Sequence, residues 1–262
     1  MKTLGVIGGM SWESTAVYYR LLNQGVAARV GGLHSAPLLI HSVDFAEIAA
    51  LQSSGDWLKA GRLLASAAKR LETAGAEALV LATNTMHQVA AAIEGAVDIP
   101  LLHIVDATGV ALGKAGVQRA GLLGTRYTME LPFWQERLAQ RFGVQLVVPD
   151  AEERDVIHRV IYDELCVGRI EEASRTTYQD IIARLAGVGA EAIILGCTEI
   201  TLLIAPSDSP LPVFDTTTLH AAAAVDFILG TTATPAELLS IAGSPERLSD
   251  ADSRAQTFRR ES

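Results

Sequence analysis

The sequence predicts an α/β protein made of two pseudo-symmetric domains, each a doubly wound parallel sheet. Short apolar runs alternate with helical patterns along the chain, which is typical of a parallel sheet with helices on both faces. Three segments also recur in the same order and at nearly constant spacing in the second part of the chain. A repeat of this kind indicates that one α/β unit occurs twice.

Each repeated segment joins an apolar run to the turn or helix start that follows it. The first copies are LGVIGGM (4–10), GAEALVLATNT (75–85) and IPLLHIVDAT (99–108), and the second copies are AGLLGTR (120–126), GAEAIILGCTE (189–199) and LPVFDTTT (211–218). We expect a first domain from residues 1–100, completed by a helix at about 215–230, and a second domain from residues 101–214. Residues 231–262 are expected to form a C-terminal extension outside the site.

The individual elements follow from apolar runs and helix end signals. Two long helices have clear ends: residues 11–30 begin with a serine cap, and residues 56–75 end at Gly75 after two basic residues. The runs between helices lack polar alternation, as strands buried on both faces do. They are LGVIG, APLLIHSV, ALVLAT, LLHIV, AGLLG, VQLVVP, AIILG and LPVF. Because ligands bind at the carboxyl ends of such strands, the turns GGM, TNT, GTR and CTE are expected to line a common site.

The composition restricts the class of ligand and the compartment. The formal net charge is −9 and the pI is about 5.2, so the chain lacks the basic surface that binds nucleic acids or acidic membranes. No apolar run approaches the roughly 20 residues that span a bilayer. The two cysteines, Cys166 and Cys197, form neither a disulfide framework nor a zinc-ligand spacing. We expect a cytoplasmic protein without a metal.

Gly8 and Gly9 in VIGGMSWEST end an apolar run just before a helix. The spacing is that of neither a phosphate loop nor a dinucleotide fingerprint, so a dinucleotide is the least favoured interpretation. A second interpretation is a tight strand-to-helix turn. The interpretation that we favour is a turn whose backbone N–H groups receive the carboxylate of a small ligand.

Thr83 and Cys197 occupy the same place in the two repeats, each after a buried strand and at or near a helix start. If a pseudo-twofold axis relates the domains, the two side chains face each other, as inversion of a carbon centre requires of two proton-transferring groups. Cys197 is the stronger base, because a helix start lowers the pKa of a thiol. The Thr83 hydroxyl is a feeble base that is activated by neighbours, acts mainly as a proton donor, or leaves its face nearly inert.

Polar residues beside this pair are candidates for binding a ligand. Asn84, Thr85 and Thr198 are expected to hydrogen-bond a carboxylate or enediolate oxygen. Glu199 is expected to hold an ammonium group or to bias Cys197, with an acid in a first helical turn as the structural alternative. For two further residues, anion binding and a structural role are equally open: His87 and Arg126.

These motifs resemble the aspartate/glutamate/hydantoin racemase superfamily, because GGM near the N-terminus, TNTMH at 83–87 and GCTE at 196–199 occur together. GGMSWEST, LHSVDF, GTRYTM and IYDELC further resemble its enterobacterial broad-specificity, aspartate/glutamate-type branch, which has a Thr/Cys pair. The resemblance covers about residues 1–229. It implies an amino-acid racemase without a cofactor, an active site between the two domains, and frequent homodimers.

The resemblance also implies roles for particular residues. Thr83 and Cys197 become the acid/base pair. Archaeal-type aspartate racemases bind the two carboxylates of aspartate with an Arg and a Lys. The corresponding positions in this sequence are about Ile48 and Cys166, so the side-chain carboxylate of aspartate would lack its expected cationic partner. We expect Cys166 to be a buried small apolar residue rather than a second catalytic thiol. The implied substrate-binding positions are Met10, Gln52, Asn84, Thr85, Thr125 and Thr198.

Two other functions stay open. The same superfamily includes malonate-type decarboxylases, in which a single cysteine protonates a carbanion from one face, and Thr83 is compatible with such an enzyme. A catalytically weak amino-acid-binding homologue is the third interpretation. Pyridoxal phosphate is not expected, because the four lysines offer no obvious Schiff-base site.

Overall fold

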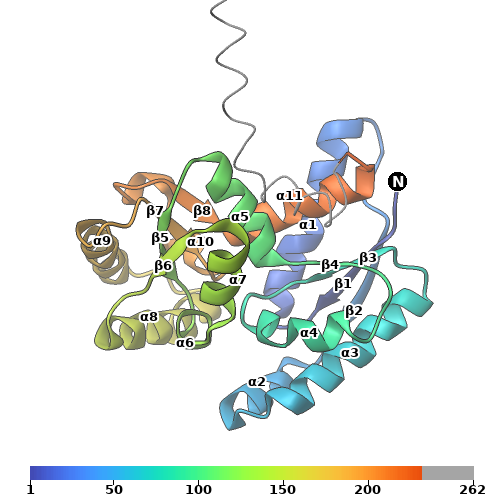
Figure 1. Ribbon diagram of the computed structural model, residues 1–262, viewed down its shortest axis with the longest axis horizontal. Coiled ribbons are helices and arrows are strands. Elements are labelled where there is room, and N and C mark those ends of the chain that lie inside the picture. The colour runs from blue at the N-terminus through green and yellow to red at the C-terminus, as the bar shows by residue number, and fades with distance from the viewer. Residues whose placement is uncertain (232–262) are drawn as a thin grey trace, which may run out of the picture. The chain divides into compact units, whose positions relative to one another are not determined.

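The computed structural model describes residues 1–231, and in this part of the chain it contains two four-stranded parallel sheets surrounded by helices (Figure 1). The first sheet has the order β2-β1-β3-β4, and its strands are β1 (Leu4–Gly8), β2 (Leu38–Ser42), β3 (Ala78–Leu81) and β4 (Leu101–Leu102). The second has the order β6-β5-β7-β8, and its strands are β5 (Arg119–Leu123), β6 (Gln145–Val147), β7 (Ala192–Leu195) and β8 (Val213–Asp215). The predicted α/β class with two similar parallel sheets is confirmed.

Helices connect the strands in both halves. Those up to β5 are α1 (Trp12–Val30), α2 (Phe45–Ser54), α3 (Trp57–Thr73), α4 (Ala90–Glu94) and α5 (Ile104–Lys114), with the 3₁₀ turn η1 (Thr85–Val89). Those after β5 are α6 (Arg126–Glu130), α7 (Phe133–Phe142), α8 (Ala151–Asp163), α9 (Glu172–Gly187), α10 (Ile200–Leu203) and α11 (Thr216–Leu229), with the 3₁₀ turns η2 (Leu165–Val167) and η3 (Pro206–Asp208). The predicted serine cap is confirmed, because the Ser11 side chain accepts the N–H of Ser14 at the start of α1.

The sequence repeat corresponds to equivalent places in the two sheets. β1 and β5 are second in their sheets and β3 and β7 third, while β4 and β8 lead directly into α5 and α11. The turns after β3 and β7 carry Thr83 and Cys197. Since each of these strands lies between two parallel neighbours, its carboxyl end opens onto the edge where such sheets bind ligands.

Burial separates the inner strands from the edge strands. β1, β3 and β7 are buried along their whole length, and β5 is buried apart from its first residue. The prediction that every apolar run is covered on both faces is wrong for β2, β6 and β8, which are only partly buried. These are edge strands, and a strand with one neighbour is covered less completely by the flanking helices.

The helix α11 packs against the first sheet rather than the second. Its residues Ala221 and Val225 share a buried cluster with Leu4 and Val6 of β1, and the carbonyl of Ile228 accepts the backbone N–H of Lys2 at 2.8 Å. We therefore propose the domain division expected from the repeat, in which residues 1–100 together with about 215–230 form one domain and residues 101–214 the other.

The expected C-terminal extension falls outside the described residues from position 232 onward. Of the helices in residues 1–231, none combines the length and apolar character that crossing a membrane requires.

Candidate active site

A cavity of about 70 Å³ opens where the turns of both halves meet. Every residue that the sequence singled out as catalytic or substrate-binding lines it: Met10, Gln52, Thr83, Asn84, Thr85, Thr125, Cys197, Thr198 and Glu199. Sequence reasoning did not select the other lining residues, which are Ser11, Ser14, Tyr18, Phe45, Ile161, Tyr162, Cys166, Gly196 and Thr217. A space of this size suits a small ligand, since one water needs about 10–15 Å³ by the same kind of measure.

Cys197 lies in the turn between β7 and α10, and its residue surface is 8% exposed. Its thiol donates a hydrogen bond to Glu199 Oε2 at 3.0 Å. Burial, followed by the negative charge of Glu199 and this hydrogen bond, raises the pKa of Cys197 well above its ordinary value. The expectation of a lowered thiol pKa is therefore wrong. The backbone N–H of Glu199 does favour the thiolate, but its effect on the pKa is smaller than that of burial and the carboxylate.

Glu199 joins Cys197 to the first half of the chain. The Thr198 hydroxyl donates to Glu199 Oε2 at 2.6 Å, and Ser14 Oγ lies 2.7 Å from Thr198 Oγ1. Because the single hydroxyl proton of Thr198 is used on Glu199, Ser14 is the donor to Thr198. Ser14 belongs to the first turn of α1, so this network crosses between the halves. The sequence signal for Ser14 was its position three residues after the predicted cap Ser11, in the first turn of the helix that follows the glycines.

Thr83 follows β3 and is partly buried. Its backbone N–H donates to Leu81 O at 2.8 Å. Within residues 1–231 its hydroxyl makes no hydrogen bond to protein, so it is available to a ligand and has no neighbouring base. Of the three possibilities considered for Thr83, activation by neighbours therefore has no support.

Asn84 presents a buried acceptor that has no partner among residues 1–231. Its Nδ2 donates to Thr216 Oγ1 at 3.0 Å, and the Thr216 hydroxyl in turn donates to Leu195 O at 2.8 Å. This chain fixes which end of the amide is nitrogen. In the described part of the chain Asn84 Oδ1 has no hydrogen-bond donor, although the residue is only 7% exposed. An unsatisfied buried acceptor costs about 1–3 kcal/mol, so a ligand that donates a hydrogen bond here gains that energy.

Thr85 is held by hydroxyl groups from the second half. Its Oγ1 lies 3.1 Å from Thr125 Oγ1 and 3.3 Å from Thr128 Oγ1, and the Thr125 side chain also caps α6 by accepting the Thr128 N–H. Gln52 reaches the same region from α2, where its Nε2 donates to Met86 Sδ at 3.0 Å. These contacts fix the polar wall of the cavity before any ligand enters.

The turns after β3 and β7 supply backbone donors at the site. The N–H groups of Asn84, Thr85 and Thr198 make no hydrogen bond within the described part of the chain. The N–H of Gly9 is used by Thr15 Oγ1 at 2.8 Å. The favoured interpretation of the glycine turn as a carboxylate receptor is thus wrong for the N–H of Gly9.

Gly9 has a steric reason to be glycine. Its φ is +92°, and a Cβ there would lie 2.2 Å from Val43 O and 2.6 Å from Val43 N. Gly9→Ala should therefore lower the free energy of unfolding by about 3 kcal/mol or more, measured by urea denaturation. Gly55 is the matched control, because its φ is +71° and nothing lies within 4 Å of its Cβ position. Gly55→Ala should cost only about 1 kcal/mol, and equal losses would contradict the steric account.

The structure also places four other residues that the sequence analysis named, and it corrects the expectation for one of them, Cys166. Cys166 is exposed rather than buried, and it lines the cavity from η2. Partial burial, with a contribution from the Glu199 charge, raises its pKa to about 11. Ile48 is fully buried in the core. Neither His87 nor Arg126 lines the cavity: His87 is buried with both ring nitrogens bonded, and Arg126 pairs with Asp155.

Among residues 1–231, the charged side chains that line the cavity are only negative. Counting residues 1–231, its lining includes no Lys, Arg or His, and Glu199 is the one carboxylate. This arrangement favours a ligand that carries a positive group. It offers no cationic side chain among residues 1–231 to pair with a second negative charge.

Comparison with known proteins gives consistent matches. The Asp/Glu/Hydantoin racemase family profile matches residues 7–224. A crystal structure from Yersinia pestis, described as a candidate Asp/Glu racemase, is 54% identical with a TM-score of 0.84, covering 87% of this chain and 100% of that one. An aspartate racemase homologue from Pyrococcus horikoshii OT3 is 33% identical with a TM-score of 0.76, covering 87% and 100% of the two chains.

One curated relative extends these matches. The broad specificity amino-acid racemase RacX of Bacillus subtilis is 22% identical over 231 residues, covering 86% of this chain and 98% of RacX.

Proposed function

The chain belongs to the Asp/Glu/Hydantoin racemase family and is an isomerase, and from this premise we propose that it racemises an amino acid by moving a proton at Cα between Cys197 and Thr83 without a cofactor. The observation that carries the proposal is that the equivalent turns after β3 and β7 bring Thr83 and Cys197 to one cavity. A planar carbanion between two such groups accepts a proton on either face, which is what racemisation requires.

The Cys197–Glu199 contact supports proton abstraction in two steps: Glu199 first deprotonates the thiol, and the thiolate then deprotonates Cα. The thiol is neutral in the free protein, because its pKa is raised by burial and then by Glu199. The hydrogen bond to Glu199 gives the thiol proton an acceptor, and the resulting thiolate then removes the proton from Cα. Protonation of Glu199 also removes the negative charge that opposes thiolate formation, so the two events assist each other.

Two sets of groups support orientation of the substrate. Asn84 Oδ1 and the Glu199 carboxylate are acceptors for the α-ammonium group. The N–H groups of Asn84, Thr85 and Thr198 are donors for the α-carboxylate, whose charge increases as the carbanion acquires enediolate character. Donors aimed at that developing charge stabilise the transition state more than the bound substrate.

The two faces are chemically unequal in this proposal. Thr83 has no neighbouring base, so its hydroxyl acts mainly as a proton donor to the carbanion, and the alkoxide that this leaves regains a proton from water as Glu199 releases one. A racemase has an equilibrium constant of one, so kcat/KM is equal in both directions whatever the two groups are. The inequality instead appears in kcat, in KM and in the isotope exchange of each enantiomer.

The negative charge of the cavity predicts that, within this proposed function, a neutral side chain on the substrate is preferred to a carboxylate. L-asparagine and L-aspartate have nearly the same shape, but only aspartate brings a second carboxylate into a cavity that contains Glu199 and no cation. Two carboxylates about 4 Å apart repel by about 4 kcal/mol at an effective dielectric constant of about 20, and by about 1 kcal/mol in bulk water. We expect kcat/KM for L-asparagine to exceed that for L-aspartate by about tenfold or more. Equal values, measured by chiral chromatography, would contradict this account of specificity.

The direct test of the proposed function is ¹H NMR in D₂O. L- and D-aspartate, L-glutamate and homoserine are followed for loss of the Cα–H signal, with chiral analysis of the product. Exchange with inversion is expected. Exchange of one enantiomer with little inversion would mean that Thr83 is nearly idle, and no exchange with any amino acid would refute racemisation.

The polar groups of the cavity favour a racemase over the alternative of a malonate-type decarboxylase. A disubstituted malonate has no ammonium group to satisfy Asn84 Oδ1, and it adds a second carboxylate next to Glu199. The homodimer and the cytoplasmic location that were expected from the sequence stay predictions. Size-exclusion chromatography with light scattering checks the first, and cell fractionation the second.

A further inference from the structure

We propose that His87 is a positioning residue that holds Thr83 in place for proton transfer. The proposal rests on the function proposed above, in which Thr83 protonates one face of the carbanion. His87 does not line the cavity, so it acts through the backbone of Thr83 rather than on the substrate.

The His87 ring connects the Thr83 turn to the start of α5. Its Nδ1 lies 2.8 Å from Thr83 O, and its Nε2 accepts the backbone N–H of Ile104 at 3.3 Å. Since Ile104 N can only donate, Nε2 carries no proton and Nδ1–H is the donor to Thr83 O. The ring is 2% exposed, so water does not compete for either bond.

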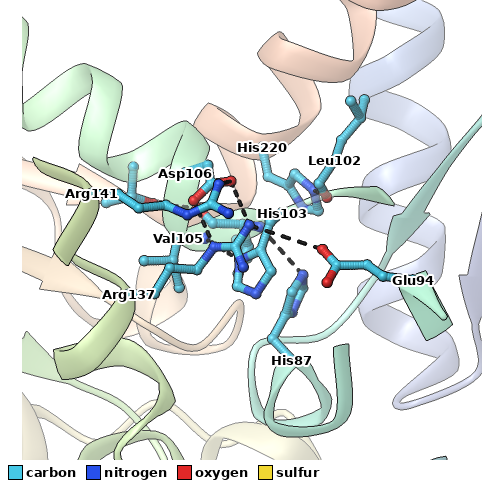
Figure 2. Close-up of polar contacts among 11 residues, drawn as sticks. His87, Glu94, Leu102, His103, Val105, Asp106, Arg137, Arg141 and His220 are labelled. Atoms are coloured by element: carbon cyan, nitrogen blue, oxygen red, sulfur yellow. Dashed lines mark hydrogen bonds and ion pairs between the residues drawn. The ribbon is translucent and has the colours of Figure 1, made fainter. Parts of the chain in front are cut away.

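The surroundings keep His87 in this neutral form. Burial, followed by the effect of His220 and with a smaller contribution from Arg137, holds the pKa of His87 well below its ordinary value. The ring of His103 lies 4.5 Å away and that of His220 lies 5.8 Å away, centroid to centroid. Figure 2 shows these rings together, with Arg137 and Asp106 beside them. A neutral imidazole has one donor and one acceptor, which matches the two contacts of His87.

Thr83 depends on His87 in a way that its neighbours do not. Asn84 is anchored by its own side chain through Thr216, and Thr85 through Thr125. Thr83 lacks a side-chain anchor within residues 1–231, and its backbone is held by Leu81 O on one side and by His87 on the other. Loss of the His87 bond should therefore displace Thr83 while leaving the anchored side chains of Asn84 and Thr85 in place.

Two substitutions separate this bond from the presence of the ring. In His87→Asn the amide nitrogen occupies the place of Nδ1 and still donates to Thr83 O. In His87→Gln the longer amide reaches the place of Nε2 and accepts from Ile104, but Thr83 O loses its donor. His103→Asn is the control within the same cluster: the Asn side chain can replace His103 Nδ1 as the acceptor of the Val105 N–H, and Thr83 is not contacted.

We expect His87→Gln to lower kcat for racemisation by about 10- to 100-fold with KM changed less than about threefold, because a displacement near 1 Å has such an effect on a reacting group. His87→Asn and His103→Asn should keep kcat within about fivefold of the wild-type enzyme. Equal kcat losses in His87→Asn and His87→Gln, or a loss in KM alone, would overturn the positioning role. Thermal unfolding is measured for all three variants. If disruption of the histidine cluster simply reduced the amount of folded protein, the apparent kcat of His103→Asn would fall as well.

A second measurement does not depend on turnover. In a long-range ¹H–¹⁵N spectrum of histidine-labelled wild-type protein at pH 7, His87 should be neutral and protonated at Nδ1. A proton on Nε2 would refute the bond to Thr83 O. If the wild-type protein racemises no amino acid, the proposed function fails and positioning for catalysis fails with it. If it does racemise and the two His87 variants behave alike, only the positioning role fails.

Discussion

Cys197→Ala should lower kcat for racemisation by more than about 10²-fold, as expected when a general acid/base is removed. The thiol is the group that Glu199 can deprotonate, and alanine leaves neither face of the carbanion with a strong base. The measurement is the rate of inversion by chiral chromatography, together with Cα–H exchange in D₂O. Racemisation retained in this variant would remove Cys197 from the mechanism.

Cys166→Ser is the matched control for the loss of a thiol from the same cavity. Cys166 also lines the cavity, but it is exposed and makes no hydrogen bond to Glu199 within the described residues. It should retain kcat within about threefold of wild type, because it removes no proton-transfer group. A loss as large as that of Cys197→Ala would mean that the two thiols work together.

Glu199→Gln should lower kcat by about 10²-fold or more while making the Cys197 thiol easier to ionise. Burial, followed by the charge of Glu199, raises the pKa of Cys197, so removal of the charge brings that pKa back down toward its ordinary value. At any fixed pH below that value the thiolate fraction then increases. The pH profile of thiol alkylation should accordingly shift to lower pH even though catalysis falls, because the acceptor for the thiol proton is lost.

The alkylation experiment is cleanest in the Cys166→Ser background, where Cys197 is the one cysteine left in the chain. Rates of reaction with iodoacetamide are compared between this background and the same protein carrying Glu199→Gln. An unchanged profile, or a shift to higher pH, would show that Glu199 does not oppose thiolate formation. A shift to lower pH with unchanged kcat would show that Glu199 is not needed as a proton acceptor.

The sequence by itself determined the buried inner strands, the repeat and the residues that follow those strands. Apolar runs such as ALVLAT and AIILG mark buried inner strands, because such a strand needs apolar side chains on both faces. The residues directly after those strands, Thr83 and Cys197, were then set at the carboxyl ends of the sheets by topology. Both of these residues line the cavity.

The tertiary structure alone decided the chemical state of those residues, because that state depends on groups distant in the sequence. A helix start predicts a lowered pKa for Cys197, but burial and the Glu199 carboxylate outweigh the local backbone effect. The N–H of Gly9 is taken by Thr15, a contact that a motif of glycines does not reveal. Thr198 meets Ser14 and Thr83 is held by His87 only after folding, since hydrogen bonds and desolvation follow distance in space and not order along the chain.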